Sequence, residues 1–579
     1  MGKGNRTQNE RAESVLAAAG AQTKKKKAPM PTWVGTLIVV SVLVLLILFA
    51  TFCILRSQGV FARGKIIART ENYKVSVPMM SYMVYTEYQN WVQNYKNTGY
   101  MQYIKGSGGD ALNTSKPLRS QNYSVVTDEK TGTTTTTTWF TYFAKQAATD
   151  VEQILRMCEL ARARGVELSA DELAEIDTSI QLMGLYAKAY GYTTNAYIAS
   201  MYGQGVTAKD VRKMMELSTL AGKYADIIND ELKAAITENR VNEAYEADKK
   251  TYDIAIDYLG YAFSATFKAE GATEETLQKY KDLQAKYKGW GENLKTIEDP
   301  DTLFTTLTGY VEEYSRDLKK ESDVADMVAE IQKINYEKPD SSDEHDDWLF
   351  NKETPRATGE FTTFTDEKAG WDEADEKYVG ATSTYSYYRV LRAVHRNDGA
   401  VRSVGHILFK SKTYDGLTTA EKLSGTPKIL AQRILDRGEA VTAKAMGHEL
   451  IAYLKEEGKL TEHKDGEATY YTIQKDVFEE FGAMTEDSNI FYEDVKKGDM
   501  VKSFEAWLFS DKRHENEISY PDAVESTHGA HVMFYTGNER QAWYAAVETD
   551  VLKKDSEKWY ENAKSAVDVT FKDYWDKIS

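Results

Sequence analysis

The longest hydrophobic stretch of the chain lies close to its start. Trp33–Leu55 is almost wholly Val, Leu, Ile and Phe, and no charged residue occurs between Ala28 and Leu55. About 20 apolar residues suffice to cross a bilayer as a helix. We therefore expect a transmembrane helix over residues 33–55.

The basic residues around this span predict its orientation. Seven Lys and Arg side chains precede it within residues 1–32, and four follow soon after it (Arg56, Arg63, Lys65, Arg69). The positive-inside rule then predicts a basic cytoplasmic tail, a single pass through the cell membrane and an extracytoplasmic body. The alternative is a cleaved signal peptide with a site at Val60-Phe61-Ala62, but the apolar run is longer than the usual 7–15 residues or so.

A helical spacing of apolar residues dominates residues 56–250. A short strand pair is expected over residues 64–78, followed by a Tyr-rich helix near residues 79–95. The polar segment 105–138, with six threonines at Thr133–Thr138, is predicted to be a solvated loop.

From Trp139 to Asp253 the chain reads as successive capped helices. Ser169 and Glu172 have the spacing of a capping box, and Thr207 and Thr237 stand at N-cap positions.

Shorter apolar runs with strand character alternate with helices over residues 251–540. In the second half of this region, His406 lies in an apolar strand and Thr426 and Pro427 stand as N-cap and first residue of a helix. A final strand begins near His531. This order predicts a small α+β domain over residues 401–540, followed by an amphipathic C-terminal helix in residues 541–579.

Residues 251–398 resemble a degenerate copy of residues 401–540. Apolar strands at both ends of the two segments match, with Tyr261 and Tyr388 in the places of His406 and His531. Chance matching of apolar strands is the alternative. If the repeat is real, the first copy lacks the paired histidines and serves as a binding or spacer domain.

Composition limits the classes of function. The whole chain has a net charge of −17. Residues 1–55 contribute +5, so the remaining residues have a net charge of −22. An acidic body argues against nucleic acid as a partner. Cys53 and Cys158 are the two cysteines, and Cys53 lies in the apolar span. A disulfide within the body and a cysteine-based site are therefore excluded.

Residues 401–540 resemble a parvulin-type peptidyl-prolyl isomerase. Four segments carry the resemblance in the family's order: His406-Ile407-Leu408, Gly498-Asp499-Met500 with Phe504, Asn516-Glu517-Ile518-Ser519, and Gly529-Ala530-His531. With its capped helices, degenerate repeat and last helix, the exported part resembles SurA/PrsA-type foldases. The resemblance implies a multidomain α+β protein: a helical chaperone-like domain (56–250), two parvulin-like domains (251–398, 401–540) and a C-terminal helix (541–579) that packs back on the helical domain.

The resemblance also implies a site. His406 and His531 would share a buried hydrogen-bond network, and Asp487 would lie near the rotating amide. Met500 and Phe504 would form the proline pocket, with Tyr492 or Phe509 as its walls. Each of these residues has a plainer role as ordinary core. For His406 and His531, the sequence is equally compatible with a direct influence on isomerisation and with a purely structural role. Because the segment before Met500 is short, a domain that only binds peptide is the alternative to a catalytic one.

No metal or other cofactor is expected. His528 and His531 are three residues apart, but in a strand they would point to opposite faces, and no carboxylates accompany them. Lys410 and Lys412 are a thin version of the basic cluster of phosphate-directed parvulins, which argues against phosphate specificity.

The sequence thus predicts a membrane-anchored foldase that binds unfolded or newly secreted polypeptides and isomerises Xaa-Pro bonds. A holdase that only binds peptide is the main alternative, and a scaffold for one dedicated partner is a weaker one. The oligomeric state is not predicted.

Overall fold

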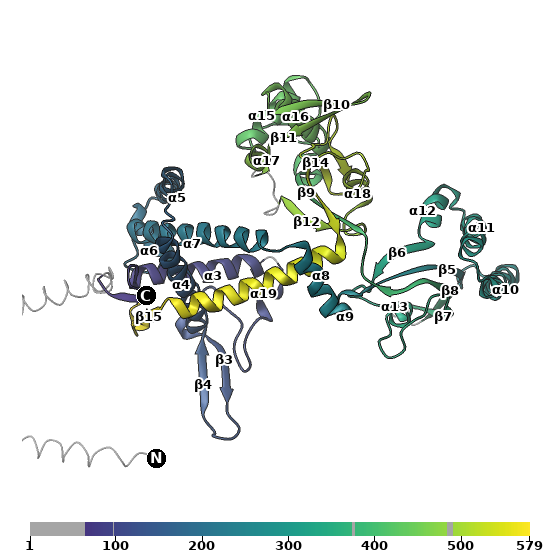
Figure 1. Cartoon of the computed structure of the whole chain (residues 1–579), viewed down its shortest axis with the longest axis horizontal. Coiled ribbons are helices and arrows are strands. Elements are labelled where there is room, and N and C mark those ends of the chain that lie inside the picture. Colours follow the sequence, from purple (N-terminus) through teal and green to yellow (C-terminus); the bar gives the residue numbers. More distant parts are fainter. Residues whose placement is uncertain (1–63, 97, 373–376, 483–489, 579) are drawn as a thin grey trace, which may run out of the picture. The chain divides into compact units, whose positions relative to one another are not determined.

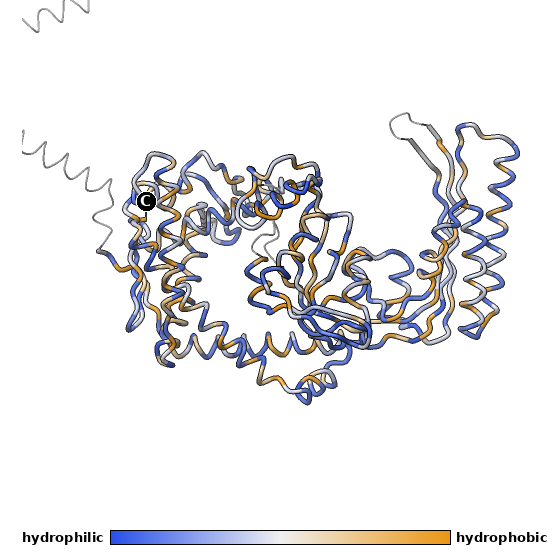
Figure 2. The backbone as a smooth tube through the Cα atoms, turned by 90° about the horizontal axis from the view of Figure 1, so that it is seen from above, coloured by the Kyte–Doolittle hydropathy of each residue, from blue (hydrophilic) through white to orange (hydrophobic). Residues whose placement is uncertain are grey.

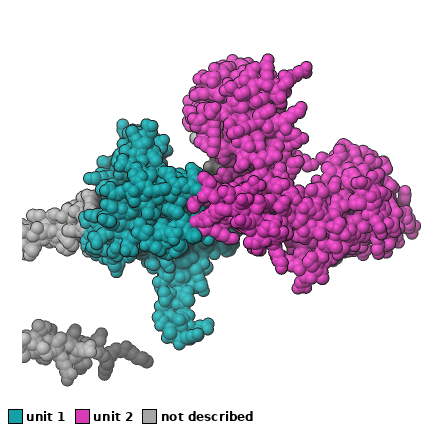
Figure 3. Space-filling model, viewed as in Figure 1, with its two compact units in different colours: residues 1–231, 556–579 teal, residues 232–555 magenta. Residues whose placement is uncertain are grey.

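The computed structural model describes residues 64–96, 98–372, 377–482 and 490–578. The described residues fall into two compact units, unit 1 from residues 64–231 with 556–578 and unit 2 from residues 232–555 (Figure 3). No helix in the described ranges is long and apolar enough to span a membrane. The basic tail and the predicted span at residues 33–55 lie outside these ranges, so the anchor remains a prediction.

Unit 1 is built around long helices. Its elements are β1 (Ile66–Arg69), β2 (Lys74–Ser76), α3 (Val77–Lys96), β3 (Asn122–Thr127), β4 (Thr134–Thr138), α4 (Trp139–Ala163), α5 (Ala170–Ala189), α6 (Thr194–Tyr202) and α7 (Ala208–Ala234), which ends three residues into unit 2. Trp91, Trp139 and Phe143 are buried where α3 packs on α4. The Ser169–Glu172 capping box is present at the start of α5, and Thr237 caps the helix that begins at Glu238, as predicted.

The end of the last long helix and the residues after it belong to the same unit. The last long helix, α19, spans Ala542–Ala566, and β15 (Thr570–Phe571) pairs with β1. The Arg119 guanidinium donates to the carbonyls of Trp575 at 2.7 Å and Ile578 at 2.9 Å. The first strand and the last residues are thereby joined in one sheet and one core.

The predicted loop at residues 105–138 is wrong in part. The threonine run forms β4, which pairs with β3 in an antiparallel hairpin that projects from unit 1 (Figure 1). Threonine is β-branched and favours extended backbone, and a cross-strand hydroxyl pair, Thr127–Thr134 at 3.0 Å, adds to the pairing.

Unit 2 begins with α8 (Glu238–Ala247) and α9 (Lys249–Tyr252), which pack on the first half of α19. A four-stranded antiparallel sheet of order β6-β5-β8-β7 follows, formed by β5 (Ala255–Lys268), β6 (Gln332–Glu337), β7 (Phe361–Asp372) and β8 (Lys377–His395). Helices α10 (Glu274–Thr296) and α11 (Pro300–Leu318) cover one face, as the right-hand end of Figure 2 shows. Helix α13 (Glu344–Leu349) covers part of the other face, and α12 spans Val324–Ala329. We call residues 255–395 the first α+β domain.

The second α+β domain, residues 400–541, has a sheet of the same connectivity. Its order is β12-β9-β14-β13, from β9 (Ala400–Lys410), β12 (Phe491–Val495), β13 (Val524–Ser526) and β14 (Gly529–Gln541). Helices α15 (Gly425–Asp436) and α16 (Ala443–Glu456) cover one face, and α18 (Lys502–Leu508) covers the other. The remaining elements are α14 (Ser411–Tyr414), a hairpin of β10 (Leu460–Asp465) with β11 (Ala468–Ile473), and α17 (Lys475–Gly482).

The predicted class is confirmed: the chain is a multidomain α+β protein with several antiparallel sheets. The predicted start of α15 is wrong by two residues. Its N-cap is Ser424, and Thr426 and Pro427 lie inside the first turn. Asn516 has a left-handed backbone, with φ 62°.

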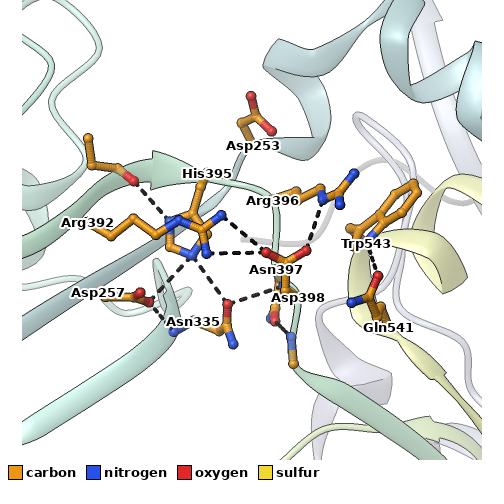
Figure 4. A network of polar contacts seen from close by, with 12 residues as sticks. Asp253, Asp257, Asn335, Arg392, His395, Arg396, Asn397, Asp398, Gln541 and Trp543 are labelled. Carbon is orange, nitrogen blue, oxygen red and sulfur yellow. Dashed lines mark hydrogen bonds and ion pairs between the residues drawn. The ribbon is translucent and has the colours of Figure 1, made fainter.

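A buried polar network joins the two α+β domains (Figure 4). His395 Nδ1 lies 2.9 Å from the Ala393 carbonyl, and its Nε2 lies 3.3 Å from Asn335 Oδ1 and 3.4 Å from Asp257. Asn397 Nδ2 donates to Glu337 at 2.6 Å, and Glu337 also binds Lys496 Nζ at 2.7 Å. The short link between β8 and β9 is therefore held by Asn335 and Glu337 of the first domain, and Glu337 in turn binds Lys496 of the second domain.

Candidate functional site

Strand β9 places one histidine on the face opposite its helix pair. Side chains alternate along a strand, so Val404, His406 and Leu408 face α18 while Ile407 and Phe409 face α15 and α16. On the neighbouring strand β14, Met533 pairs with His406 and His531 pairs with Leu408. His406 and His531 are therefore diagonal neighbours on one face.

The two histidines are hydrogen-bonded to each other. His406 Nδ1 lies 3.0 Å from His531 Nδ1, and the side chains are almost fully buried. One of these nitrogens must carry a hydrogen and the other must accept it, so the two rings cannot both be protonated at Nδ1.

Ser526 continues the chain of hydrogen bonds. Its Oγ lies 2.8 Å from His531 Nε2 and accepts the backbone N–H of His528 at 3.1 Å. Because a hydroxyl both donates and accepts, Ser526 fits either tautomer of His531. The network fixes the two ring planes rather than a single proton position.

An apolar floor lies beside the histidine pair. Phe504 is buried at the start of α18, with its ring edge-on to His406 at 5.7 Å and to His531 at 5.5 Å between centroids. Met500 precedes the helix and packs in the same cluster. The ring centroid of Tyr492, on β12, lies 5.2 Å from that of His406.

The turn that carries Met500 is held by one carboxylate. Glu505 Oε1 accepts the backbone N–H groups of Gly498 at 2.6 Å and Met500 at 2.9 Å. Gly498 has φ 105°, a conformation that other residues rarely adopt. The sequence Gly-Asp-Met followed by Glu505 thus builds a defined turn.

These side chains line one cavity of about 690 Å³. Its lining combines an apolar floor with polar and basic groups at the rim: His406, Leu408, Lys410, Ser411, Lys412, Tyr492, Asp499, Met500, Val501, Phe504, Thr527, His528 and His531. A cavity of this size and character suits a short peptide segment with an apolar side chain at its centre.

Five of the predicted site residues meet at this cavity: His406, His531, Met500, Phe504 and Tyr492. Phe509 does not line it. It follows α18, with the Arg402 guanidinium 5.8 Å from its ring centroid, so the suggested wall at Phe509 is not found. Asp487 lies outside the described residues.

The sequence reasoning missed most of the rim. Lys410 follows Leu408 by two residues on β9, so strand alternation gave a signal that was not used. His528 was assigned to the face opposite His531. This is wrong, because β14 begins at Gly529 and His528 lies in the hairpin before it, where strand alternation does not apply.

The first α+β domain fills the corresponding place with aromatic rings. The N–H of Gly260 donates to the carbonyl of Ile331, just before β6, at 2.8 Å, as that of His406 donates to the carbonyl of Ile490, just before β12, at 2.8 Å. Gly260 pairs with Tyr388 as His406 pairs with Met533. Gly260 therefore occupies the position of His406.

The predicted equivalence of Tyr261 and Tyr388 with the two histidines is wrong in register. Tyr261 packs toward α10 and α11, whereas Tyr388 lies on the other face, and Ser386 occupies the place of His531. A Cβ on Gly260 would lie 2.2 Å from Cδ1 of Tyr388. His345 stacks on the Tyr388 ring at 4.6 Å, and burial raises the pKa of Tyr388 to about 12.

One group of acidic and histidine side chains within the described ranges is close enough to hold a metal ion: Asp343, His345 and Asp346. Asp343 caps α13 by accepting the N–H groups of His345 and Asp346. Asp346 accepts the Tyr336 hydroxyl at 2.8 Å. Helix capping and hydrogen bonding account for these three side chains.

No family model and no curated protein matches this chain. Among solved structures, the foldase protein PrsA from Lactococcus lactis is similar over 73% of this chain and all of its own length, at 11% identity and a TM-score of 0.16. A TM-score this low has no weight for the fold or the function.

Proposed function

We propose that this protein is a membrane-anchored extracytoplasmic foldase whose second α+β domain isomerises Xaa-Pro bonds in unfolded polypeptides. The observation that carries the proposal is the cavity in which Met500 and Phe504 form an apolar floor beside the hydrogen-bonded pair His406 and His531. The order of the parvulin-like motifs in the sequence supports the same reading.

The chemistry needs neither a nucleophile nor a metal. Rotation about an Xaa-Pro bond must overcome about 18–20 kcal/mol of amide resonance, and no covalent bond is broken. The pyrrolidine ring would rest on Met500 and Phe504, away from water. In this position a twisted amide, which is less conjugated than the planar one, would meet the ordered ring edges of the histidine pair. Each 1.4 kcal/mol or so of preferential binding to the twisted form gives about a tenfold faster exchange.

A first experiment measures isomerisation of Xaa-Pro peptides by the full-length protein, by a protease-coupled assay and by exchange NMR. We expect Met500→Ala to lower kcat/KM about tenfold, since removing its side chain costs roughly 1.5 kcal/mol of apolar contact with proline. Met327→Ala, in the first α+β domain, is the matched control and should leave activity unchanged. Wild-type activity no higher than background would refute catalysis.

A holdase that only binds peptide is the second candidate. The filled counterpart in the first domain, with Tyr388 over Gly260, supports a non-catalytic role for at least that copy. Suppression of client aggregation that is equal in wild type and Met500→Ala, without isomerisation by either, would favour this candidate.

The anchor is part of the proposal and has its own test. Full-length protein should stay with membranes through alkaline carbonate extraction, and protease added to intact cells or protoplasts should digest the body. Release of the body by carbonate would indicate a cleaved leader instead.

A further inference from the structure

A nearly uncharged stretch follows the acidic start of α5. Residues 178–208 contain a single charged side chain, Lys188, in a chain that is 28% charged. The acidic residues of α5 all lie in its first half: Asp171, Glu172, Glu175 and Asp177. The half of α5 that leads to α6 therefore carries one charged side chain, the exposed Lys188, among mainly apolar ones.

Much of this apolar surface is exposed in unit 1. Five side chains in the second half of α5 and the α5–α6 turn, which we call the aromatic tip, are between 49% and 70% exposed: Leu182, Leu185, Tyr186, Tyr190 and Tyr192. Other side chains of the same helical hairpin pack in the interior of unit 1, since Ile176, Ala187 and Ile198 are buried. The side chains of the aromatic tip therefore contribute little to the packing of the α5–α6 hairpin.

The aromatic tip is tied to the part of unit 1 where the described chain begins. The Lys65 carbonyl accepts the N–H of Val77, the first residue of α3, at 2.9 Å. One turn later, Ser81 Oγ donates to the carbonyl of Tyr202, the last residue of α6, at 2.6 Å. Helix α6 has nine residues, so the tip lies about 13 Å along α6 from this contact.

The length of chain before Gly64 decides what the tip can reach. Eight residues, 56–63, separate the predicted membrane span from the first described residue. Fully extended, they cover about 30 Å. The start of α3, and with it the aromatic tip, is therefore confined to the neighbourhood of the bilayer surface.

The chemistry of the tip matches the membrane–water interface. Tyrosine combines an apolar ring with a hydroxyl and concentrates at headgroup level. Leu182 and Leu185 supply apolar surface, and the near absence of charge avoids the cost of bringing ions to the acyl boundary. Arg63, Lys65 and Arg69, near the same end of the chain, would meet anionic headgroups.

We propose that the aromatic tip inserts into the outer headgroup region of the bilayer and holds unit 1 against the membrane. The inference rests on the proposed anchoring. It assigns α5 and α6 a second membrane contact besides the predicted span.

Nitroxide accessibility in the full-length protein tests the proposal. Tyr190→Cys carries the label in a Cys53→Ser background, and the protein is reconstituted in vesicles of phosphatidylcholine and phosphatidylglycerol. Cys158 is fully buried and stays unlabelled. The control is Tyr103→Cys, an equally exposed tyrosine beyond the far end of α3, a helix about 30 Å long.

We expect the ratio of oxygen to nickel-chelate accessibility to be several-fold higher at residue 190 than at residue 103, and Leu185→Ser to reduce the difference. Equal, aqueous values in protein that resists carbonate extraction would overturn the inference while leaving the anchor intact. Loss of the protein from vesicles would refute the anchor itself. Immobilisation of the label only on addition of an unfolded client, or dipolar broadening that grows with protein density, would overturn the inference in favour of a client or a second copy.

Discussion

At the level of single residues, one equivalent backbone position has very different surroundings in the two α+β domains. His406 in the second domain and Gly260 in the first occupy the same place in the sheet. In one domain the side chain at this position joins a buried hydrogen bond beside an open cavity. In the other, the missing side chain makes room for the Tyr388 ring. Together with Tyr388 in the place of Met533 and Ser386 in the place of His531, this position distinguishes the filled site of the first domain from the lined cavity of the second.

This contact predicts a coupling that can be measured. Gly260→Ala should lower the free energy of unfolding of unit 2 by about 1–3 kcal/mol, because the new Cβ meets the Tyr388 ring. In a Tyr388→Ala background the same change should cost less, since the ring atoms Cδ1 and Cε1 are gone and only the Tyr387 carbonyl oxygen, 2.8 Å from the new Cβ, remains. The double-mutant cycle consists of the wild type, Gly260→Ala, Tyr388→Ala and the double variant. Urea unfolding followed by circular dichroism measures the free energy of unfolding of each.

Gly309→Ala is the control for that cycle. Gly309 lies in α11, and a Cβ there would meet no atom within 4 Å. Replacing it should stabilise the domain by about 0.5–1 kcal/mol, because alanine is the better helix former. Equal costs of Gly260→Ala in both backgrounds would contradict the assigned contact.

The rim of the cavity predicts a charge preference. Lys410, Lys412 and His528 lie beside the apolar floor, so an acidic residue next to the proline should be favoured. Lys412→Glu should lower kcat/KM for Glu-Pro peptides and raise it for Lys-Pro peptides, by about two- to fivefold each, as befits an exposed charge. The difference should shrink at high salt. Identical ratios in wild type and variant would exclude a role for this lysine.

At the level of elements, the turn before α18 governs the cavity. Glu505 accepts two backbone N–H groups of that turn, and these position Met500. Glu505→Ala should lower isomerase activity at least fivefold with a modest loss of stability, about 1–2 kcal/mol. Glu505→Gln keeps an acceptor oxygen and should recover part of the activity. A fall in activity that simply follows the fraction unfolded would show that Glu505 acts on stability alone.

Helices and strands were easier to predict from the sequence than the direction in which the side chains of a strand point. Helix starts at Ser169 and Thr237 depend on local chemistry, and the capping side chains are found where expected. The register of β5 and β8 depends on packing across the sheet. A shift of one residue turns every side chain to the other face, which is how Tyr261 came to be matched with His406.

At the level of the whole molecule, the cavity was predictable only in part. His406, His531, Met500 and Phe504 lie in sequence motifs and meet in the structure. Lys412, Thr527 and His528 come from segments beside the strands, where neither periodicity nor a motif marks a face. The division into two units was not predictable either, because α7 and α19 run from one unit into the other without a break.

Cys158 offers a probe of unit 1 alone. It is fully buried on α4, donates to the Leu217 carbonyl at 3.3 Å, and burial raises the pKa of its thiol from 9.0 to about 12. In the unfolded chain the thiol ionises near its ordinary pKa, whereas in the folded unit it remains neutral. Stability from this group is therefore complete below about pH 9 and is lost as the pH rises toward 12.

In a Cys53→Ser background, unit 1 should lose about 1 kcal/mol of unfolding free energy between pH 8 and pH 10 relative to Cys158→Ala, as measured by urea unfolding.

At pH 8 the folded thiol should resist iodoacetamide, and its labelling should follow the unfolding of unit 1. Leu450→Ala, in the core of the second α+β domain, should then shift the unit 2 transition by about 2–5 kcal/mol without moving the labelling midpoint. A common shift of both would mean that α7 and α19 couple the two units into one cooperative transition.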